Sequence, residues 1–364
     1  MPAIYFTVTN DLSYDQRMIR ICTSLAKAGY DVTLAGRKMN GSVPLISQPY
    51  KQKRLNCWFQ KGKLFYAEFN IRLFIFLLTK RMDALCAIDL DTIIPCYYIS
   101  KFKKVKRIYD AHEYFSQQKE IITRPSVYKI WHGIEKKYLP KFSAGYTVGH
   151  CIRDEFKKLY GVHYEVIRNL PVLKEEKEPE PDNKEKIILY QGAVNEARGF
   201  EFLIPAMKNI DAILHIYGDG NFVDQTKALI KSNNLENKVL MKSKLVPEAL
   251  EKITRNAYIG INLVENTGLN QYYSLANKFF DFIKNGIPQV TMNFPEYKNI
   301  NDEFKIAVLI NDLNTTSIEN AINSLLLNET FYQGLKENCH TASKKLNWQQ
   351  EEKKLLAFYK NIFG

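Results

Sequence analysis

The second half of the chain places a cation and glycines where a segment of strand character turns into a helix. Arg198 lies between Gly192 and Gly199, after a β-rich run at residues 187–191 and before a helical run at 200–207. Cationic side chains and backbone amides at helix N-termini both stabilise phosphate oxygens. Arg198 is therefore either a ligand for a phosphate group or a solvated surface arginine.

Two further segments of this half carry residues of similar chemistry. Gly218 and Gly220 form a glycine turn after the next β-rich run. Asn277 and Lys278 open a predicted helix at 276–285, and Asp281 follows one turn later. A carboxylate that accepts hydrogen bonds from ribose hydroxyls is a common nucleotide ligand, although Asp281 also fits an ordinary helix carboxylate.

In the first half, His112 and Glu113 follow a predicted strand at 107–110. Ligands of parallel α/β sheets bind beyond the carboxyl ends of the strands, so both side chains are catalytic candidates, and the sequence does not rank them. Asp15 and Arg17 stand at the start of the first predicted helix. Arg17 fits a phosphate or acceptor ligand, while Asp15 fits either that loop or a helix cap.

Strands and helices alternate along most of the chain, which is typical of doubly wound parallel sheets. We predict an α/β protein of two Rossmann-like domains. Residues 1–173 form the first, and the charged, proline-containing segment 174–186 is a linker without an apolar face. Residues 187–347 form the second domain. The apolar helix at 348–364 must dock on another element.

Charge is distributed unevenly between the halves. Residues 1–168 hold 28 Lys and Arg against 14 Asp and Glu, a net charge of +14, while the remainder holds 23 against 25, a net of −2. A basic half suggests an anionic partner, but these bases belong to no nucleic-acid-binding motif, so we expect no nucleic acid partner. The six cysteines have no paired spacing, and we expect no metal site and no bound cofactor.

Several segments in order resemble glycosyltransferase family 4, whose members have the GT-B fold. They are residues 9–37, 87–115, 143–161 and 166–172 in the first half, and 189–207, 216–221 and 274–290 in the second. The resemblance implies two Rossmann-like domains with parallel sheets facing across a cleft. It also implies that the last helix crosses back to the N-terminal, acceptor-binding domain.

The same resemblance assigns roles to the candidate residues. Donor binding falls to Gly192, Arg198, Gly218, Gly220, Asn277, Lys278 and Asp281. Asn277 and Lys278 match a subgroup with an NK pair before the donor-binding helix. Two charged groups common in the family are missing, because Ala193 replaces an arginine and Tyr273 replaces the first of two carboxylates. Lys278 is a candidate replacement for that arginine.

The resemblance further implies a retaining, metal-independent transfer from a nucleoside-diphosphate sugar. A UDP-sugar is favoured and a GDP-sugar is the alternative. The acceptor is expected to be a glycan or a lipid-linked molecule in polysaccharide or glycolipid assembly. Basic and aromatic residues interleave at 58–81, which suits an anionic membrane surface or a partly buried helix. With no secretion signal at the start, we expect a cytoplasmic protein, peripheral on the inner face of the plasma membrane.

Two other functions compete with sugar transfer. The loss of one of the two family carboxylates also fits a GT-B enzyme that rearranges its donor, such as a nucleotide-sugar epimerase. The basic half fits a nucleic-acid- or membrane-binding protein without catalysis. An NAD-dependent dehydrogenase is excluded, because no GxGxxG follows the first strand.

Overall fold

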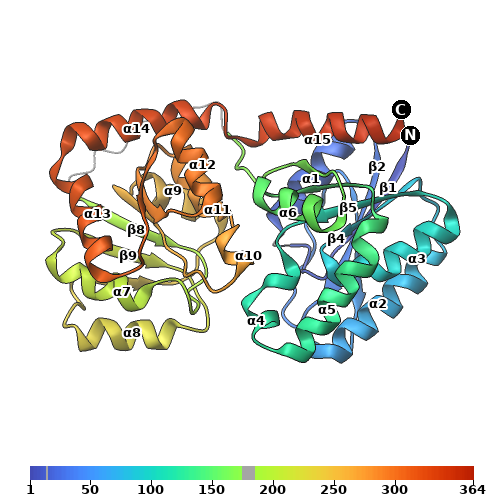
Figure 1. The fold of residues 1–364 in the computed structure, drawn as a ribbon, viewed down its shortest axis with the longest axis horizontal. Coiled ribbons are helices and arrows are strands. Elements are labelled where there is room, and N and C mark those ends of the chain that lie inside the picture. Colours follow the sequence, from blue (N-terminus) through green and yellow to red (C-terminus); the bar gives the residue numbers. More distant parts are fainter. Residues whose placement is uncertain (14, 174–184) are drawn as a thin grey trace. The chain divides into compact units, whose positions relative to one another are not determined.

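The computed structural model describes residues 1–13, 15–173 and 185–364. These residues form two compact units (Figure 1). One unit contains Met1–Asn169 together with Glu351–Gly364, and the other contains Leu170–Gln350. Most of the predicted linker, residues 174–184, lies outside the described residues.

The first unit is built on a seven-stranded sheet in the order β3-β2-β1-β4-β5-β6-β7, and each neighbouring pair is parallel. The strands are β1 (Ala3–Thr7), β2 (Asp31–Lys38), β3 (Lys51–Asn56), β4 (Ala84–Ile88), β5 (Lys106–Ala111), β6 (Ala144–Thr147) and β7 (Glu165–Val166). The strand order reverses direction between β1 and β4, as in a Rossmann fold.

Helices connect these strands and cover both faces of the sheet (Figure 1). They are α1 (Gln16–Lys27), α2 (Gly62–Leu78), α3 (Ile93–Lys103), α4 (Lys119–Ile122), α5 (Pro125–Tyr138), α6 (His150–Tyr160) and α15 (Trp348–Phe363), with short 3₁₀ turns η1 (Leu90–Thr92), η2 (Phe115–Gln117) and η3 (Leu139–Lys141).

Successive residues of β1 show how both faces are covered. Side chains alternate across a strand, so Tyr5 and Phe6 point to opposite faces. Tyr5 packs on Phe76 of α2, with ring centroids 6.3 Å apart, and Phe6 packs on Tyr359 of α15, at 6.1 Å. Tyr359 is fully buried and its hydroxyl lies 3.2 Å from that of Tyr146 on β6. The C-terminal helix thus completes the core of the first unit.

The basic segment 51–54 belongs to the edge strand β3, which lacks an alternating apolar pattern because it is largely exposed. Ser13 and Gln16 have the spacing of a capping box, but the N-cap of α1 is Asp15, whose carboxylate accepts from the Met18 amide at 3.0 Å. The hydroxyl of Ser13 instead accepts from Arg54.

The second unit holds a six-stranded parallel sheet in the order β10-β9-β8-β11-β12-β13. The strands are β8 (Ile187–Gln191), β9 (Ile213–Tyr217), β10 (Val239–Lys242), β11 (Ile259–Asn262), β12 (Gln289–Met292) and β13 (Ala307–Ile310). The helices are α7 (Phe200–Ala206), α8 (Val223–Ser232), α9 (Pro247–Arg255), α10 (Leu269–Tyr272), α11 (Asn277–Lys284), α12 (Pro295–Phe304), α13 (Thr315–Leu327) and α14 (Glu329–Ser343), with the 3₁₀ turn η4 (Met207–Asn209).

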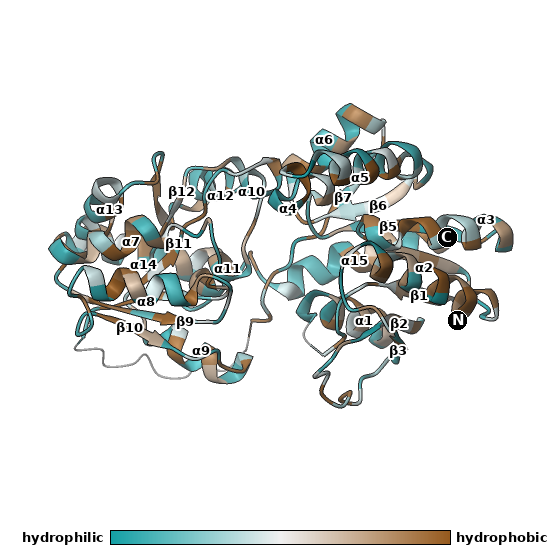
Figure 2. Cartoon of the chain, turned by 90° about the horizontal axis from the view of Figure 1, so that it is seen from below, coloured by the Kyte–Doolittle hydropathy of each residue, from teal (hydrophilic) through white to brown (hydrophobic). Residues whose placement is uncertain are grey.

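Strand β8 separates two apolar clusters in this unit. Ile188 and Tyr190 belong to the larger core, whereas Leu189 packs in a smaller cluster with Phe282 of α11. Most helices carry both polar and apolar stretches, as expected of helices that cover a sheet (Figure 2). Within each unit the parallel strands place their carboxyl ends at one edge of that unit's own sheet, and the loops that follow them carry most of its candidate site residues.

Candidate active site

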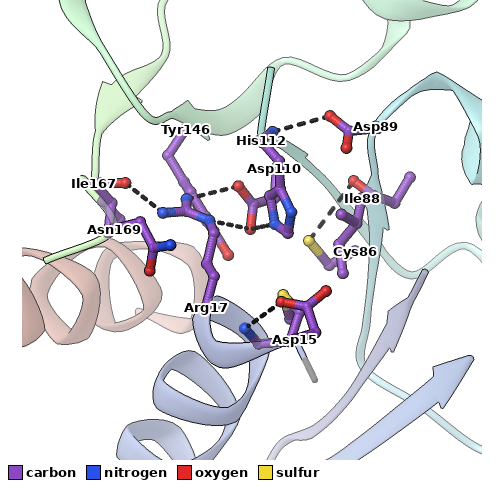
Figure 3. A network of polar contacts seen from close by, with 12 residues as sticks. Asp15, Arg17, Cys86, Ile88, Asp89, Asp110, His112, Tyr146, Ile167 and Asn169 are labelled. Atoms are coloured by element: carbon purple, nitrogen blue, oxygen red, sulfur yellow. Dashed lines mark hydrogen bonds and ion pairs between the residues drawn. The ribbon is translucent and has the colours of Figure 1, made fainter. Parts of the chain in front are cut away.

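In the first unit, an ion-paired cluster forms where β4 and β5 end (Figure 3). Arg17 of α1 contacts Asp110 through two nitrogens, with Nη2 at 2.8 Å from Oδ1 and Nε at 3.4 Å from Oδ2. Its Nη1 donates to the backbone oxygen of Ile167 at 2.8 Å. Both side chains are buried, Arg17 being 3% and Asp110 0% exposed. Arg17, predicted to bind phosphate or acceptor, instead has its guanidinium enclosed and neutralised by Asp110.

His112 extends the same cluster beyond the end of β5 (Figure 3). Its Nε2 lies 3.1 Å from Asp110 Oδ2, and its backbone amide donates to Asp89 Oδ1 at 2.9 Å. Burial lowers the pKa of His112, but the adjacent Asp110 carboxylate outweighs burial and raises the pKa to about 9. The raised pKa favours the imidazolium form, in which the Nε2–H donates to Asp110.

Asp89 holds the loop after β4 in an unusual backbone conformation, with a φ of 54°. Its amide donates to the backbone oxygen of Asp110 at 3.0 Å while its carboxylate accepts from His112. Such a conformation costs on the order of 1–3 kcal/mol in a non-glycine residue and is retained where surrounding contacts over-determine it. Asp89 therefore positions His112.

Glu113 and Asp15, the other candidates in this unit, have local partners. Glu113 accepts a hydrogen bond from Gln118 Nε2, which joins it to the loop after β5. Asp15 caps α1 and also accepts from Asn10 Nδ2 at 3.1 Å. Of the two interpretations of Asp15, the helix cap is the one seen in the structure.

Stability is expected to fall as the pH rises through about 9, because of His112. Its folded-state pKa, about 9, lies above the ordinary value of 6.5. The contribution of His112 to the free energy of unfolding is therefore complete below pH 6.5 and is lost as the pH rises through 9. The free energy of unfolding should fall by at most about 3 kcal/mol over this range. Chemical denaturation at pH 6.5, 8 and 9.5 measures it, and His112→Gln should flatten the profile. Parallel profiles for the two proteins would contradict this assignment.

In the second unit, the loop after β8 packs against the glycine turn after β9. A Cβ on Gly218 would lie 1.9 Å from the backbone oxygen of Gly192, and one on Gly220 would lie 2.3 Å from that of Val194. The Val194 amide donates to the backbone oxygen of Asp219 at 3.0 Å. Gly218 and Gly220 are thus needed for the close backbone approach that shapes the loop containing Gly192.

Lys278 of α11 extends toward this loop. Its Cε lies 3.9 Å from the position that a Cβ on Gly192 would occupy, and its Nζ lies 3.6 Å from the ring centroid of Tyr190. Nζ is buried and has no hydrogen-bond partner among the described residues. Burial, and then the nearby charge of Arg198, lower the pKa of Lys278 well below its ordinary value.

Lys278 and Arg198 are therefore two basic side chains whose positive charges would repel each other beside a glycine loop. Such an arrangement is unfavourable by itself and becomes favourable when an anion binds between the cations. Arg198 precedes Gly199, which has a φ of 73° and is the N-cap of α7. The structure thus brings together three of the predicted donor ligands, Gly192, Arg198 and Lys278.

Asp281 lies on α11, one turn after Asn277, and accepts from Gln191 Nε2 at 3.2 Å. Gln191, the last residue of β8, also accepts from Thr254 Oγ1 at 2.7 Å. This chain of hydrogen bonds orients the Asp281 carboxylate beside the strand end. Asn277, the first residue of α11, is exposed.

Several residues that contact the candidate site residues were not predicted from the sequence. Asp110 stands in the same Tyr109–Glu113 string as His112, yet nothing in the sequence indicates its pairing with Arg17, 93 positions away. Tyr190 and Gln191 appear only as strand residues, although they contact Lys278 and Asp281. No group of three or more His, Cys, Asp or Glu in the described part of the chain is arranged to hold a metal ion. No helix of that part is long and apolar enough to cross a membrane.

Residues 172–345, which include the whole site of the second unit, match the family model described as glycosyl transferases group 1. The chain is a glycosyltransferase. No curated protein matches its sequence.

Solved structures of this enzyme class share the fold over the full chain. Sucrose-phosphate synthase of Thermosynechococcus elongatus aligns with a TM-score of 0.84 at 15% identity, covering 100% of this chain and 99% of that one. HepE of Anabaena in complex with UDP-glucose aligns with a TM-score of 0.78 at 11% identity, covering 99% and 100%. WaaG, a glycosyltransferase involved in lipopolysaccharide biosynthesis, aligns with a TM-score of 0.73 at 12% identity, covering 97% and 98%.

These likenesses confirm the predicted fold class of the glycosyltransferase, an α/β protein of the GT-B type with two parallel-sheet, Rossmann-like domains.

Proposed function

We propose that this enzyme is a retaining glycosyltransferase of family 4, in the subgroup with the Asn277–Lys278 pair, and that it uses a UDP-sugar as donor. The proposed position of the donor site rests mainly on the buried Lys278 amine. This amine has no hydrogen-bond partner among the described residues and lies beside a glycine loop near Arg198. A diphosphate supplies the negative charge that this arrangement lacks. The UDP-glucose complex of HepE supports UDP as the nucleotide.

In this proposal the second unit, Leu170–Gln350, binds the donor. Lys278 and Arg198 hold the diphosphate, the loop at Gly192 offers backbone amides, and Asp281 accepts from the ribose hydroxyls. Many family members have an arginine at the position of Ala193, and in this enzyme Lys278 supplies the positive charge of that arginine. The first unit binds the acceptor, and His112 and Glu113 are its proposed catalytic residues.

The reaction exchanges one bond at the anomeric carbon. The bond from this carbon to the leaving phosphate oxygen breaks, and a bond from the acceptor oxygen forms on the same face. The acceptor proton passes to the leaving phosphate. No covalent intermediate forms with the protein, so catalysis depends on the charge of Lys278 and Arg198 around the departing diphosphate.

A thermal-shift panel of nucleoside diphosphates and their sugars tests the donor assignment. We expect UDP and a UDP-sugar to raise Tm, since a ligand stabilises the native state according to its occupancy, by roughly 2.7 kcal/mol at a hundredfold excess over Kd. GDP and GDP-sugars serve as the comparison, and product analysis with and without acceptor separates transfer from donor rearrangement. No stabilisation by any member of the panel would contradict the proposed function.

We further propose that the enzyme works in the cytoplasm on polysaccharide or glycolipid precursors, at the anionic inner face of the plasma membrane. Helix α2 exposes Leu64, Ile71 and Ile75, each by about 60%, between exposed bases at Lys63 and Arg81. An exposed apolar face flanked by cations suits a membrane interface.

Flotation with vesicles containing anionic lipid tests this association. We expect the protein to float with anionic vesicles and to remain in the bottom fraction with neutral vesicles. Changing both Ile71 and Ile75 to Gln should lower the affinity for anionic vesicles roughly tenfold, because two apolar side chains are removed from the membrane interface. Equal recovery with both vesicle types and both proteins would contradict it.

A further inference from the structure

A cavity of about 600 Å³ lies in the first unit, among α2, η1, α3, η2, α4 and α5. Drug-sized and substrate-sized ligands occupy cavities of roughly 300–1,000 Å³. η1 follows β4, and η2 and α4 follow β5, so the cavity lies at the carboxyl-end edge of the sheet, where ligands of such folds bind. None of the residues assigned above to donor binding or catalysis lines it.

Its wall is mostly apolar. Three aromatic rings join its elements, because Trp131 of α5 packs on Tyr66 of α2 and on Phe115 of η2, with centroids 5.1 and 4.8 Å apart. Ile94 and Ile134 add aliphatic surface. This apolar part of the wall provides favourable contact to a hydrocarbon chain. The polar part of the lining comes from Asp91 and from Lys63, Asn70, Gln118, Glu120 and Arg124.

One polar atom in the lining has no partner. Asp91 lines the cavity and is only 8% exposed. Its Oδ2 accepts from Thr9 Oγ1, whereas its buried Oδ1 has no hydrogen-bond partner among the described residues. A buried carboxylate oxygen left unpaired is costly, and a ligand hydroxyl that donates to it removes that cost.

Asp91 also links the cavity to the reacting end of the unit. Burial raises the pKa of Asp91 to about 7, with further effects from Glu113 and His112, so these three groups lie within electrostatic range of one another. Asn70 of α2 donates to the backbone oxygen of Asp91 at 2.9 Å, which holds η1 against the cavity wall.

We propose that this cavity binds the acceptor, and that the acceptor is an amphiphile whose hydrocarbon chain lies against the aromatic wall while a head-group hydroxyl donates to Asp91. The assignment rests on the proposed transferase function and names the chemical class of its second substrate. Asp91 is a binding residue for the head group, and the aromatic wall selects for the chain.

Calorimetric titration of the UDP-loaded enzyme tests the assignment with three probes. Octyl β-D-glucopyranoside, below its micelle concentration, carries chain and hydroxyls, methyl β-D-glucopyranoside carries hydroxyls only, and octyldimethylamine oxide carries the chain without a hydroxyl donor. Because each buried methylene favours binding, the octyl glucoside should bind at least about 100-fold more tightly than the methyl glucoside.

Two variants and one control assign the contacts. Ala67 lines the cavity from its exposed side, and Ala67→Trp should fill it and weaken both octyl probes about tenfold or more. Asp91→Asn should weaken the octyl glucoside about tenfold and leave the amine oxide unchanged, an outcome that a merely structural role would not produce. Ala357→Trp, at an exposed alanine of α15, should change nothing.

Equal affinity for the octyl and methyl glucosides, or unchanged binding of the octyl probes in Ala67→Trp, would overturn the assignment while UDP binding in the same samples still supports the transferase. Absence of UDP binding in the parent protein would instead overturn the proposed function on which the acceptor assignment rests.

Discussion

Replacing Lys278 by methionine is expected to abolish most sugar transfer while making the unliganded protein more stable. The Lys278 amine is buried 3.6 Å from the centre of the Tyr190 ring, and Arg198 adds a second positive charge nearby. Methionine fills a similar volume without a charge to desolvate, so we expect a gain on the order of 1 kcal/mol in the free energy of unfolding. Loss of one group stabilising the leaving diphosphate should lower kcat by about 10²–10³-fold.

Steady-state kinetics and chemical denaturation measure the two effects. Lys252→Met is the matched control, since Lys252 is an exposed lysine on α9 of the same unit and should leave both quantities unchanged. If Lys278→Met keeps the wild-type kcat and donor affinity, Lys278 is not a donor-binding residue.

The same amine should make donor binding dependent on pH. Burial and Arg198 lower the pKa of free Lys278, and a bound diphosphate must raise it again. Binding therefore takes up protons at pH values between the lowered pKa of free Lys278 and the higher pKa of the bound form, and the affinity for the donor rises as the pH falls through this range. Titration calorimetry of UDP in two buffers of different ionisation enthalpy detects this uptake, and Lys278→Met should lose it.

Breaking the Arg17–Asp110 pair from one side is expected to give the largest loss of stability in the first unit. Arg17→Met leaves the Asp110 carboxylate, which is 0% exposed, without its bidentate partner and leaves the Ile167 oxygen without its donor. Removing one partner of a buried ion pair typically costs about 3–5 kcal/mol. Equilibrium denaturation of the variant measures the loss.

A double variant separates the pair from its single members. Arg17→Met with Asp110→Leu removes both charges, so it should be more stable than Arg17→Met alone, because no buried charge is left unpaired. It should nevertheless lose activity, because His112 then lacks the Asp110 carboxylate that holds its ring at 3.1 Å. Additive losses of stability in the two single variants and the double variant would show that the two charges do not interact.

The elements with strong local patterns were predictable from the sequence. The β-rich run 187–191 lies between Lys186 and Gly192, and it is strand β8 in the structure. The run 84–88 is entirely apolar because β4 is buried on both faces. The edge strand β3 was missed because an exposed edge tolerates the basic sequence of 51–56. Helix α2 is apolar around its circumference, so its sequence does not distinguish a core face from a binding face.

Side-chain partners were much less predictable than strands. The sequence indicated that Arg198 and Lys278 could bind phosphate, because residue type and a position beside a helix start carry that information. It could not indicate that Lys278 is buried over Tyr190, since that contact depends on how α11 packs against β8. For Arg17, the position before a helix suggested an exposed ligand, whereas β5 places Asp110 beneath it.

The sequence by itself determined the alternation of strands and helices, the two-domain α/β class and the residue types available for binding phosphate, because periodicity and glycine positions are local properties. Only the tertiary structure decided which charges are paired and which remain available for a ligand. Arg17 and Lys278 both bury a basic group, yet Arg17 has Asp110 and Lys278 has no hydrogen-bond partner for its amine among the described residues. That difference arises from side chains brought together across parallel strands, at sequence separations that no local pattern records.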